Sequence, residues 1–331
     1  MPQGAGSFAI ENTMWVNHYN PALAYDPANG QFLAAWRSDS GTAYGRRIDA
    51  VTGQLLDTTF QIEDSTANGI DLDAGHSVLG GSYLVSWRTS GTVYARRVQP
   101  DDTVGNLEQL MSASNLEWPR VSAHPAVARF LVAAVDEGTD QVVGRLVGAA
   151  DGTPVGNQFL VTPAGDNPEG IGTTANPHDH SLAVGYYDLT TGSPKISFAN
   201  GLCVSGDPAT TTESGATATI GVRLCAAPSA DVVVDVVSTD TGEGTVDPAH
   251  LTFTTADWST EKTVTVSPVD DGVVDGSVTY LVTLTVDDAV SPDDYDGVID
   301  AVTVTNVDLE GLIFYDGFES GDTSMWTEEV Q

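Results

Sequence analysis

The chain has 331 residues, with 12 Lys or Arg and 46 Asp or Glu, so its formal net charge is −34. A polyanion of this size repels phosphate backbones and anionic lipids, which argues against nucleic-acid or membrane-surface binding. No apolar run reaches the roughly 18 residues of a transmembrane helix, so we expect no membrane insertion. The 41% hydrophobic content and 34 glycines indicate a folded, turn-rich protein of about two domains.

An apolar run recurs four times in the first part of the chain. The runs are 32–36 (FLAAW), 83–87 (YLVSW), 130–134 (FLVAA) and 182–186 (LAVGY), and their starts are 51, 47 and 52 residues apart. A polar turn and a second strand follow, at 44–48, 94–98 and 143–147. Outer strands are expected at 60–62 and 159–161. An all-strand period near 50 residues predicts the blades of a β-propeller.

Residues 1–201 resemble the loosely conserved blades of bacterial secreted β-propellers, in which an aromatic-ended strand precedes a GRR-type strand. The fourth repeat stops after 196–198 without an outer strand, whereas 8–11 (FAIE) matches the outer strand 60–63 (FQIE). We therefore expect the N-terminal strand to complete the last blade and close a four-bladed ring, which would hide both sheet edges. The competing interpretation is an incomplete ring with blades missing upstream.

From residue 202 to 310 the pattern changes to alternating β-branched runs, at 217–222, 232–236, 263–266, 280–284 and 302–305. Five such runs separated by Gly, Pro and Asp predict an antiparallel, immunoglobulin-like β-sandwich. The segments 213–215 (ESG), 251–259 (LTFTTADWS), 269–276 (VDDGVVDG) and 302–308 (VTVTNVD) resemble a Calx-beta domain, a calcium-binding module. The expected fold class is thus all-β, with a propeller-like domain followed by a sandwich.

The Calx-beta resemblance implies one calcium ion held by carboxylates in loops at one end of the sandwich. Calcium takes six to eight oxygen ligands, so several loops must converge. The matching positions are Glu213, Asp240, Asp271, Asp275 and Asp308, with Asp270 as a neighbour that could also serve. The family often ends its last strand in three acids, but this chain has 306–308 (NVD). That departure leaves a metal-free structural sandwich as the alternative.

Two cysteines, Cys203 and Cys225, flank an acidic segment. In a secreted β domain they would form a disulfide, and two unrelated buried thiols are the alternative. The N-terminus 1–4 (MPQG) has no basic or apolar leader region, so either the protein is cytosolic or the chain begins after a removed leader. Residues 311–331 contain 316–326 (DGFESGDTSMW), which resembles a C-terminal segment of secreted bacterial proteins and favours an extracellular or cell-surface location.

Other constellations give no catalytic assignment. His178 and His180 flank Asp179 and could form a metal clip, but no further ligand is identifiable. Arg46, Arg96 and Arg145 recur once per repeat, either as a ring facing an anionic ligand or as partners of inter-blade carboxylates. The equivalent tryptophans at 36 and 87 are expected in the blade core. A serine-hydrolase motif is absent.

We therefore expect a non-enzymatic binding, adhesion or structural protein. Its propeller would present a face to a protein or glycan ligand, and its sandwich would be a spacer stiffened by calcium. The alternative is an extracellular carbohydrate-active enzyme, a propeller glycosidase or lyase with an accessory sandwich. Two carboxylates about 5–10 Å apart beside exposed aromatic residues would favour the enzyme. The fold alone does not decide between the two.

Overall fold

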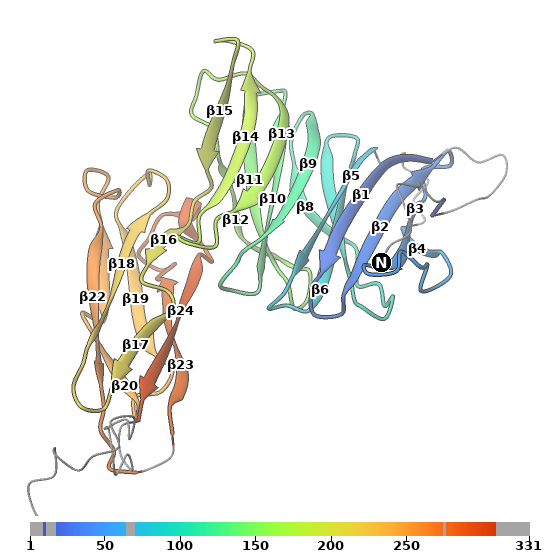
Figure 1. Cartoon of the computed structure of the whole chain (residues 1–331). Helices are drawn as coiled ribbons and strands as arrows, with labels where there is room; N and C mark the ends of the chain where they lie inside the picture. Colours follow the sequence, from blue (N-terminus) through green and yellow to red (C-terminus); the bar gives the residue numbers. More distant parts are fainter. Residues whose placement is uncertain (1–8, 11–17, 64–69, 274–275, 309–331) are drawn as a thin grey trace, which may run out of the picture.

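The computed structural model describes residues 9–10, 18–63, 70–273 and 276–308. Within them the chain is all-β apart from the short 3-10 helix η1 (Asp293–Tyr295), so the predicted all-β class is confirmed, and the sheets are compatible with a propeller followed by a sandwich. Figure 1 shows four small sheets side by side in the N-terminal part and a separate pair of sheets in the C-terminal part. None of the described helical segments is long and apolar enough to cross a membrane.

Each N-terminal sheet is an antiparallel meander of strands consecutive in the chain. The first sheet contains β1 (His18–Asp26), β2 (Gln31–Ser38), β3 (Ala43–Asp49) and β4 (Phe60–Glu63). The second contains β5 (Ile70–Ser77), β6 (Ser82–Thr89), β7 (Thr92–Val98) and β8 (Glu108–Ser112). The third contains β9 (Leu116–Ala123), β10 (Arg129–Asp136), β11 (Gln141–Gly148) and β12 (Pro154–Leu160), and the fourth β13 (Pro168–Ala175), β14 (Leu182–Asp188) and β15 (Ser193–Phe198).

The sheets stack face to face because side chains alternate along each strand. On β6, Tyr83 and Val85 are buried against the first sheet, whereas Leu84 is buried in the core shared with the third sheet. The four predicted apolar runs coincide with β2, β6, β10 and β14, the second strand of each sheet. This arrangement is the one expected of propeller blades.

A backbone irregularity repeats with the same spacing as the apolar runs. The first strand of each sheet contains a residue with positive φ, at Asn20 (50°), Asp71 (56°), Trp118 (49°) and Gly170 (61°). The strand register shifts at each of these positions, which identifies a β-bulge. Three are not glycine, although non-glycine residues rarely adopt this conformation. The repeated bulge independently supports the equivalence of the four repeats.

The segment expected to close a ring lies partly outside the described residues, which include Ala9 and Ile10 but not residues 8 and 11. Ile10 packs against the first sheet, beside Trp36 and Ile48, and its carbonyl oxygen accepts a hydrogen bond from Arg46. The first and fourth sheets lie at opposite ends of the row in Figure 1. Completion of the fourth sheet by this segment therefore stays a prediction.

The C-terminal part is a sandwich of two sheets. One has the order β16-β18-β22-β20 and the other β17-β24-β23-β19-β21, in which only the pair β17 and β24 is parallel. The strands are β16 (Leu202–Ser205), β17 (Ala209–Thr212), β18 (Ala218–Leu224), β19 (Val232–Ser238), β20 (Gly244–Asp247), β21 (His250–Phe253), β22 (Lys262–Pro268), β23 (Val278–Val286) and β24 (Ile299–Val307). Cys203 and Cys225 form a disulfide, with an S–S distance of 2.08 Å.

One hydrophobic core continues from the repeat sheets into the sandwich. It contains Leu131 of the third sheet, Val184 of the fourth, and Leu202 and Val302 of the sandwich. At the junction a Cβ on Gly156 would collide with the carbonyl oxygen of Asp296, so β12 and the loop after η1 approach closely only because residue 156 is glycine. The two parts are therefore packed together as one body.

We predict that Asp71→Val destabilises the protein by about 1–2 kcal/mol more than Asp71→Asn, because a β-branched residue is strained at positive φ while Asn adopts it readily. Both variants remove the charge that pairs with Arg88 at 2.9 Å. Urea unfolding of the two variants measures this difference, to which the loss of the hydrogen bonds from Asn20 and Arg88 in Asp71→Val adds, and equal midpoints would contradict the prediction.

Candidate functional site

The carboxylates predicted to bind calcium follow the ends of four strands. Glu213 follows β17, Asp240 follows β19, Asp270 and Asp271 follow β22, and Asp308 follows β24. The register places these strand ends at one end of the sandwich: β17 runs parallel to β24, and the C-terminal end of β22 pairs with the start of β20. The topology thus brings the five described candidates to the same end.

Glu213 is the most perturbed member of this group. It is 8% exposed, and its Oε2 has no hydrogen-bond partner. Burial raises its pKa to about 6, and surrounding negative charges add to the effect. In decreasing order of effect, these charges belong to Asp308, Asp271, Asp270 and Glu243. We call Glu213 and these four residues the acidic cluster.

The loop after β22 is folded around its own carboxylates. Asp270 accepts the N–H of Gly272 and Asp271 accepts the N–H of Val273, at 3.0 and 2.9 Å. Asp308 accepts the N–H of Gly276 at 3.0 Å, which ties this loop to the end of β24. The predicted ligand Asp275 lies outside the described residues.

Glu243 belongs to the cluster but was not among the predicted ligands. Its Oε2 accepts a hydrogen bond from the side-chain amide of Asn306 at 3.2 Å, and the same amide lies 3.3 Å from the carbonyl oxygen of Val269. Asn306 is 1% exposed, and its Oδ1 accepts the hydroxyl of Thr211. An aspartate at 306 could not donate these bonds, so the departure from three terminal acids has a structural role here.

Asp240 is placed differently from the other predicted ligands. The largest electrostatic contributions to the raised pKa of Glu213 come from other carboxylates. One of its carboxylate oxygens accepts the N–H of Gly242 at 3.0 Å, within the turn that leads to Glu243. Asp240 therefore shapes the loop that carries Glu243.

The donors in this cluster are carboxylate oxygens, which calcium prefers. In the described part of the chain, no three His, Cys, Asp or Glu side chains are already arranged to hold a metal ion. A bound cation would relieve the repulsion among the carboxylates around the unpartnered Oε2 of Glu213.

The recurring arginines Arg46 and Arg96 contact groups of the protein itself. Arg96 bridges two sheets through Glu63 of β4, with 3.0 Å between Nε and Oε2, and Arg46 donates to the carbonyl oxygen of Asp57. Burial lowers the pKa of Arg145. Trp36 and Trp87 are buried, at 5% and 2% exposure. These positions support blade packing.

The His178–Asp179–His180 turn does not form a metal clip in the described structure. His178 is exposed, whereas His180 is buried and hydrogen-bonded to Asp300 of the sandwich, with 2.8 Å between Nδ1 and Oδ1. Asp179 accepts hydrogen bonds from Ser181. Sequence spacing suggested two imidazoles on one face, but the turn directs them into different environments.

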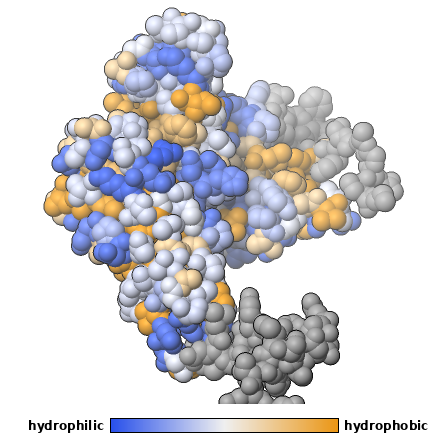
Figure 2. Space-filling model, turned by 60° about the vertical axis from the view of Figure 1, so that its left-hand side comes forward, coloured by the Kyte–Doolittle hydropathy of each residue, from blue (hydrophilic) through white to orange (hydrophobic). Residues whose placement is uncertain are grey.

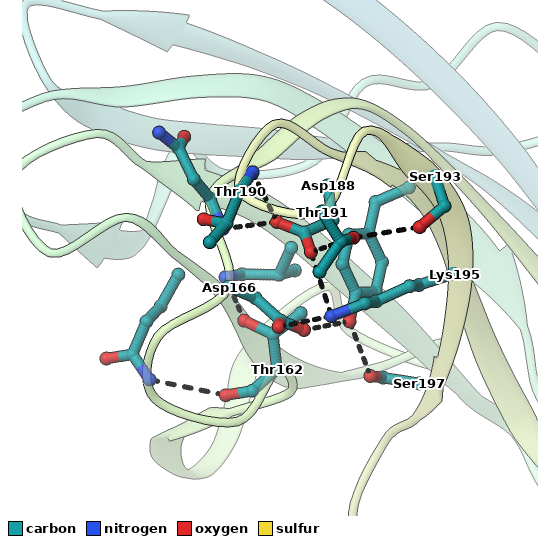
Figure 3. A network of polar contacts seen from close by, with 12 residues as sticks. Thr162, Asp166, Asp188, Thr190, Thr191, Ser193, Lys195 and Ser197 are labelled. Atoms are coloured by element: carbon teal, nitrogen blue, oxygen red, sulfur yellow. Dashed lines mark hydrogen bonds and ion pairs between the residues drawn. The ribbon is translucent and has the colours of Figure 1, made fainter.

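Figure 3 shows a second polar network, in the fourth sheet. Lys195 Nζ lies 2.5 Å from Asp166 Oδ1 and 2.8 Å from Asp188 Oδ2. Hydrogen bonds from Lys195 and then Thr191 hold the pKa of Asp188 well below its usual range. Tyr186 donates its hydroxyl proton to Asp166 at 2.5 Å. Each ionised group in this network has a partner. Because Lys195 lies on β15 and Asp188 lies on β14, their ion pair stabilises the β14–β15 hairpin.

No family model matches the chain, and no curated protein matches it. Solved structures with a similar arrangement include a provisionally assigned exo-beta-1,3-galactanase from Bifidobacterium bifidum s17, at 13% identity, covering 56% of this chain and 67% of that one, TM-score 0.38. The Dos1 propeller has 9% identity over 74% and 66%, TM-score 0.35. AofleA from Arthrobotrys oligospora has 11% identity over 88% and 93%, TM-score 0.34. These likenesses carry no argument about function.

We predict that Glu213→Gln stabilises the calcium-free protein at pH 7 and reduces its loss of stability as pH rises. Because the folded-state pKa of Glu213 is raised to about 6, its favourable contribution is present below the unfolded value near 4.3 and is lost as pH rises through 6. Melting temperatures in chelator between pH 4.5 and 7.5 measure the effect.

The matched control is Glu261→Gln, which neutralises an exposed glutamate next to the opposite end of β22. This variant should keep the wild-type pH profile. A Glu213→Gln profile identical to wild type would contradict the prediction.

Proposed function

We propose that the chain is an extracellular or cell-surface, non-enzymatic binding or adhesion protein. Its repeat domain presents a ligand-binding surface, and its Calx-beta-like sandwich is a spacer stiffened by one calcium ion. The unpartnered, buried Oε2 of Glu213 within a group of carboxylates carries this proposal. Such an arrangement costs stability unless a cation neutralises it.

Glu213, Asp270, Asp271 and Asp308 would supply carboxylate oxygens to the ion. Glu243 would add negative charge from the neighbouring loop while Asn306 holds its side chain. Asp240 and Asp275 complete the ligand set implied by the family resemblance. The bound ion would cross-link the loops that follow β17, β22 and β24, and so stiffen the end of the sandwich that faces away from the repeat domain.

The disulfide supports the extracellular assignment, because such bonds persist in oxidising compartments. It joins β16 to the residue directly after β18. A weak calcium site also suits an extracellular module, since such modules bind calcium with dissociation constants of about 10⁻⁴–10⁻³ M.

The fourth sheet supports a binding role for the repeat domain. Its outward face exposes Tyr187 (44%), Ile196 (70%) and Phe198 (44%). The equivalent face of each preceding sheet is covered by the next sheet. Figure 2 shows apolar patches separated by hydrophilic residues over the visible surface. An apolar face of this kind suits an apolar protein partner better than a polar glycan.

One observation favours the carbohydrate-active alternative. Arg88 joins two carboxylates, with Nε 2.9 Å from Asp71 and Nη1 3.1 Å from Glu117. Burial raises the pKa of Glu117, a requirement for a general acid, while Arg88 opposes the shift. Release of reducing sugar from a polysaccharide panel by wild type but not by Glu117→Gln would favour the enzyme. Absence of turnover supports the binding protein.

We predict that calcium raises the melting temperature of the full chain by several degrees at 100 times its dissociation constant. Binding to the folded state alone would contribute about 2.7 kcal/mol at that concentration. Scanning calorimetry in calcium and in chelator measures the shift. Asp271→Ala should reduce it strongly, because that variant removes a ligand and leaves β22 unchanged.

Asp231→Asn is the matched control, since Asp231 precedes β19 at the end of the strand opposite Asp240. This variant should keep the full calcium shift. The absence of a calcium shift in wild type would overturn the calcium site and leave the sandwich as a metal-free spacer.

A further inference from the structure

Four buried or half-buried ionisable side chains meet where the repeat domain contacts the sandwich. His124 follows β9 and His180 precedes β14, whereas Asp207 lies between β16 and β17 and Asp300 lies on β24. The side chains of His180 and Asp300 are 1% and 0% exposed, and that of His124 is 8% exposed. Each domain supplies half of the cluster, the histidines on one side and the carboxylates on the other.

The geometry suits a doubly protonated imidazole at His180. Its Nδ1 lies 2.8 Å from Asp300 Oδ1, and its Nε2 lies 3.4 Å from Asp207 Oδ2. A neutral imidazole has only one N–H, so it could not donate toward both carboxylates. The second oxygen of Asp300 has no hydrogen-bond partner, and it lies 3.9 Å from Nε2 of His124.

The backbone at His180 is coupled to the same contact. His180 has a φ of 59°, which non-glycine residues seldom adopt. The carbonyl oxygen of the preceding residue, Asp179, accepts the N–H of Val204 on β16 at 2.9 Å. A turn held in an uncommon conformation thus carries both the side-chain pairing and a backbone hydrogen bond to the sandwich.

The remaining charges at this junction come from three elements. Arg129 of β10 lines a small cavity of about 20 Å³ together with His124 and His180. Asp179 pairs with Arg223 of β18, at 3.5 Å. A groove of about 500 Å³, lined by Arg129, Asp207 and Asp300, runs along the junction, whereas the two histidines line the smaller cavity. The side chain of Asp207 is 21% exposed, so the cluster borders solvent on the side of this residue.

We propose that His124, His180, Asp207 and Asp300 form a pH-dependent latch that locks the turn 178–181 of the repeat domain to the sandwich near neutral pH. Loss of the proton from His180 breaks the latch on the alkaline side. Gain of a proton by His124, close to the imidazolium of His180, weakens it on the acid side. The bistable element is the turn 178–181, which is either locked to β16 and β24 or free of them.

The pKa shifts of His180 and His124 have the directions that a latch closed near neutral pH requires. Burial disfavours the charged form of His180, but its hydrogen bond to Asp300 and the charges of Asp300 and Asp207 outweigh burial and raise its pKa. Its contribution is therefore present below pH 6.5 and is lost as pH rises through the raised value. Burial lowers the pKa of His124. The contribution of its neutral form is present above pH 6.5 and is lost as pH falls.

Hydrogen exchange of the Val204 amide in the full chain tests the latch, because this amide bonds to Asp179 across the junction. Its protection factor should be maximal near neutral pH. On the alkaline side it should fall by up to tenfold for each pH unit between about pH 6.5 and the raised pKa of His180, as expected for the loss of one linked proton, and it should level off above that pKa. A protection factor that stays constant between pH 6 and 9 would overturn the proposal.

His180→Asn removes the pairing and keeps a residue that tolerates positive φ. Its Val204 protection should be low and independent of pH between 6 and 9. The matched control is His250→Asn, because His250 pairs with Asp235 at 2.7 Å but is 69% exposed and lies within the sandwich. The control should keep the wild-type profile, and a profile altered as strongly as that of His180→Asn would contradict the latch.

Asp207→Asn provides a milder variant if His180→Asn fails to fold. It removes one of the two negative charges on His180 but leaves the Asp300 contact. The alkaline loss of protection should then occur at a lower pH than in wild type. An unchanged or higher transition pH would also count against the latch.

Discussion

The rest of the structure depends on one continuous hydrophobic core that runs from the third repeat sheet through the fourth sheet into the sandwich. Alternate side chains on β10 face opposite neighbours, so each sheet can be buried only if another layer covers it. The third sheet is covered by the fourth, and this core continues into β16 and β24. The position of the sandwich is therefore set by the apolar residues that it shares with the third and fourth sheets.

This packing gives the two ends of the sandwich different surroundings for their carboxylates. At the end that meets the repeat domain, carboxylates are buried and require cationic partners, which His180 provides for Asp300. At the far end, carboxylates gather away from Arg223 and Lys262, because these two basic residues lie where β18 ends and β22 begins. The buried carboxylate at the first end is neutralised by a histidine of the same protein. The carboxylates at the second end would be stabilised by a cation bound from solution.

Periodic features were predictable from sequence. The spacing of the FLAAW-type runs located the second strand of all four sheets, because burial on both faces requires continuous apolar residues. The sandwich strands followed from alternating β-branched residues. The repeated bulge was missed, although Asn20, Asp71 and Gly170 belong to residue types that tolerate positive φ and recur at the repeat spacing. Trp118 at the equivalent position of the third sheet obscured the pattern.

Long-range contacts were not predictable from one sequence. Glu243 joins the acidic cluster only because the β19–β20 turn folds beside β22, and Asn306 serves as a cross-link rather than as a lost ligand. His180 and Asp300 are 120 residues apart. The Calx-beta resemblance nevertheless named four of the five members of the acidic cluster, because loops that follow adjacent strands meet at one end of a sandwich.

The most direct test of the calcium account is a carboxyl NMR titration of Glu213 in the full chain, with and without calcium. The account predicts an apparent pKa near 6 in chelator, as burial and the acidic cluster require. It also predicts a marked decrease when calcium is present, because the ion stabilises the ionised form. A pKa near the ordinary value of about 4.3 in both conditions would contradict the account.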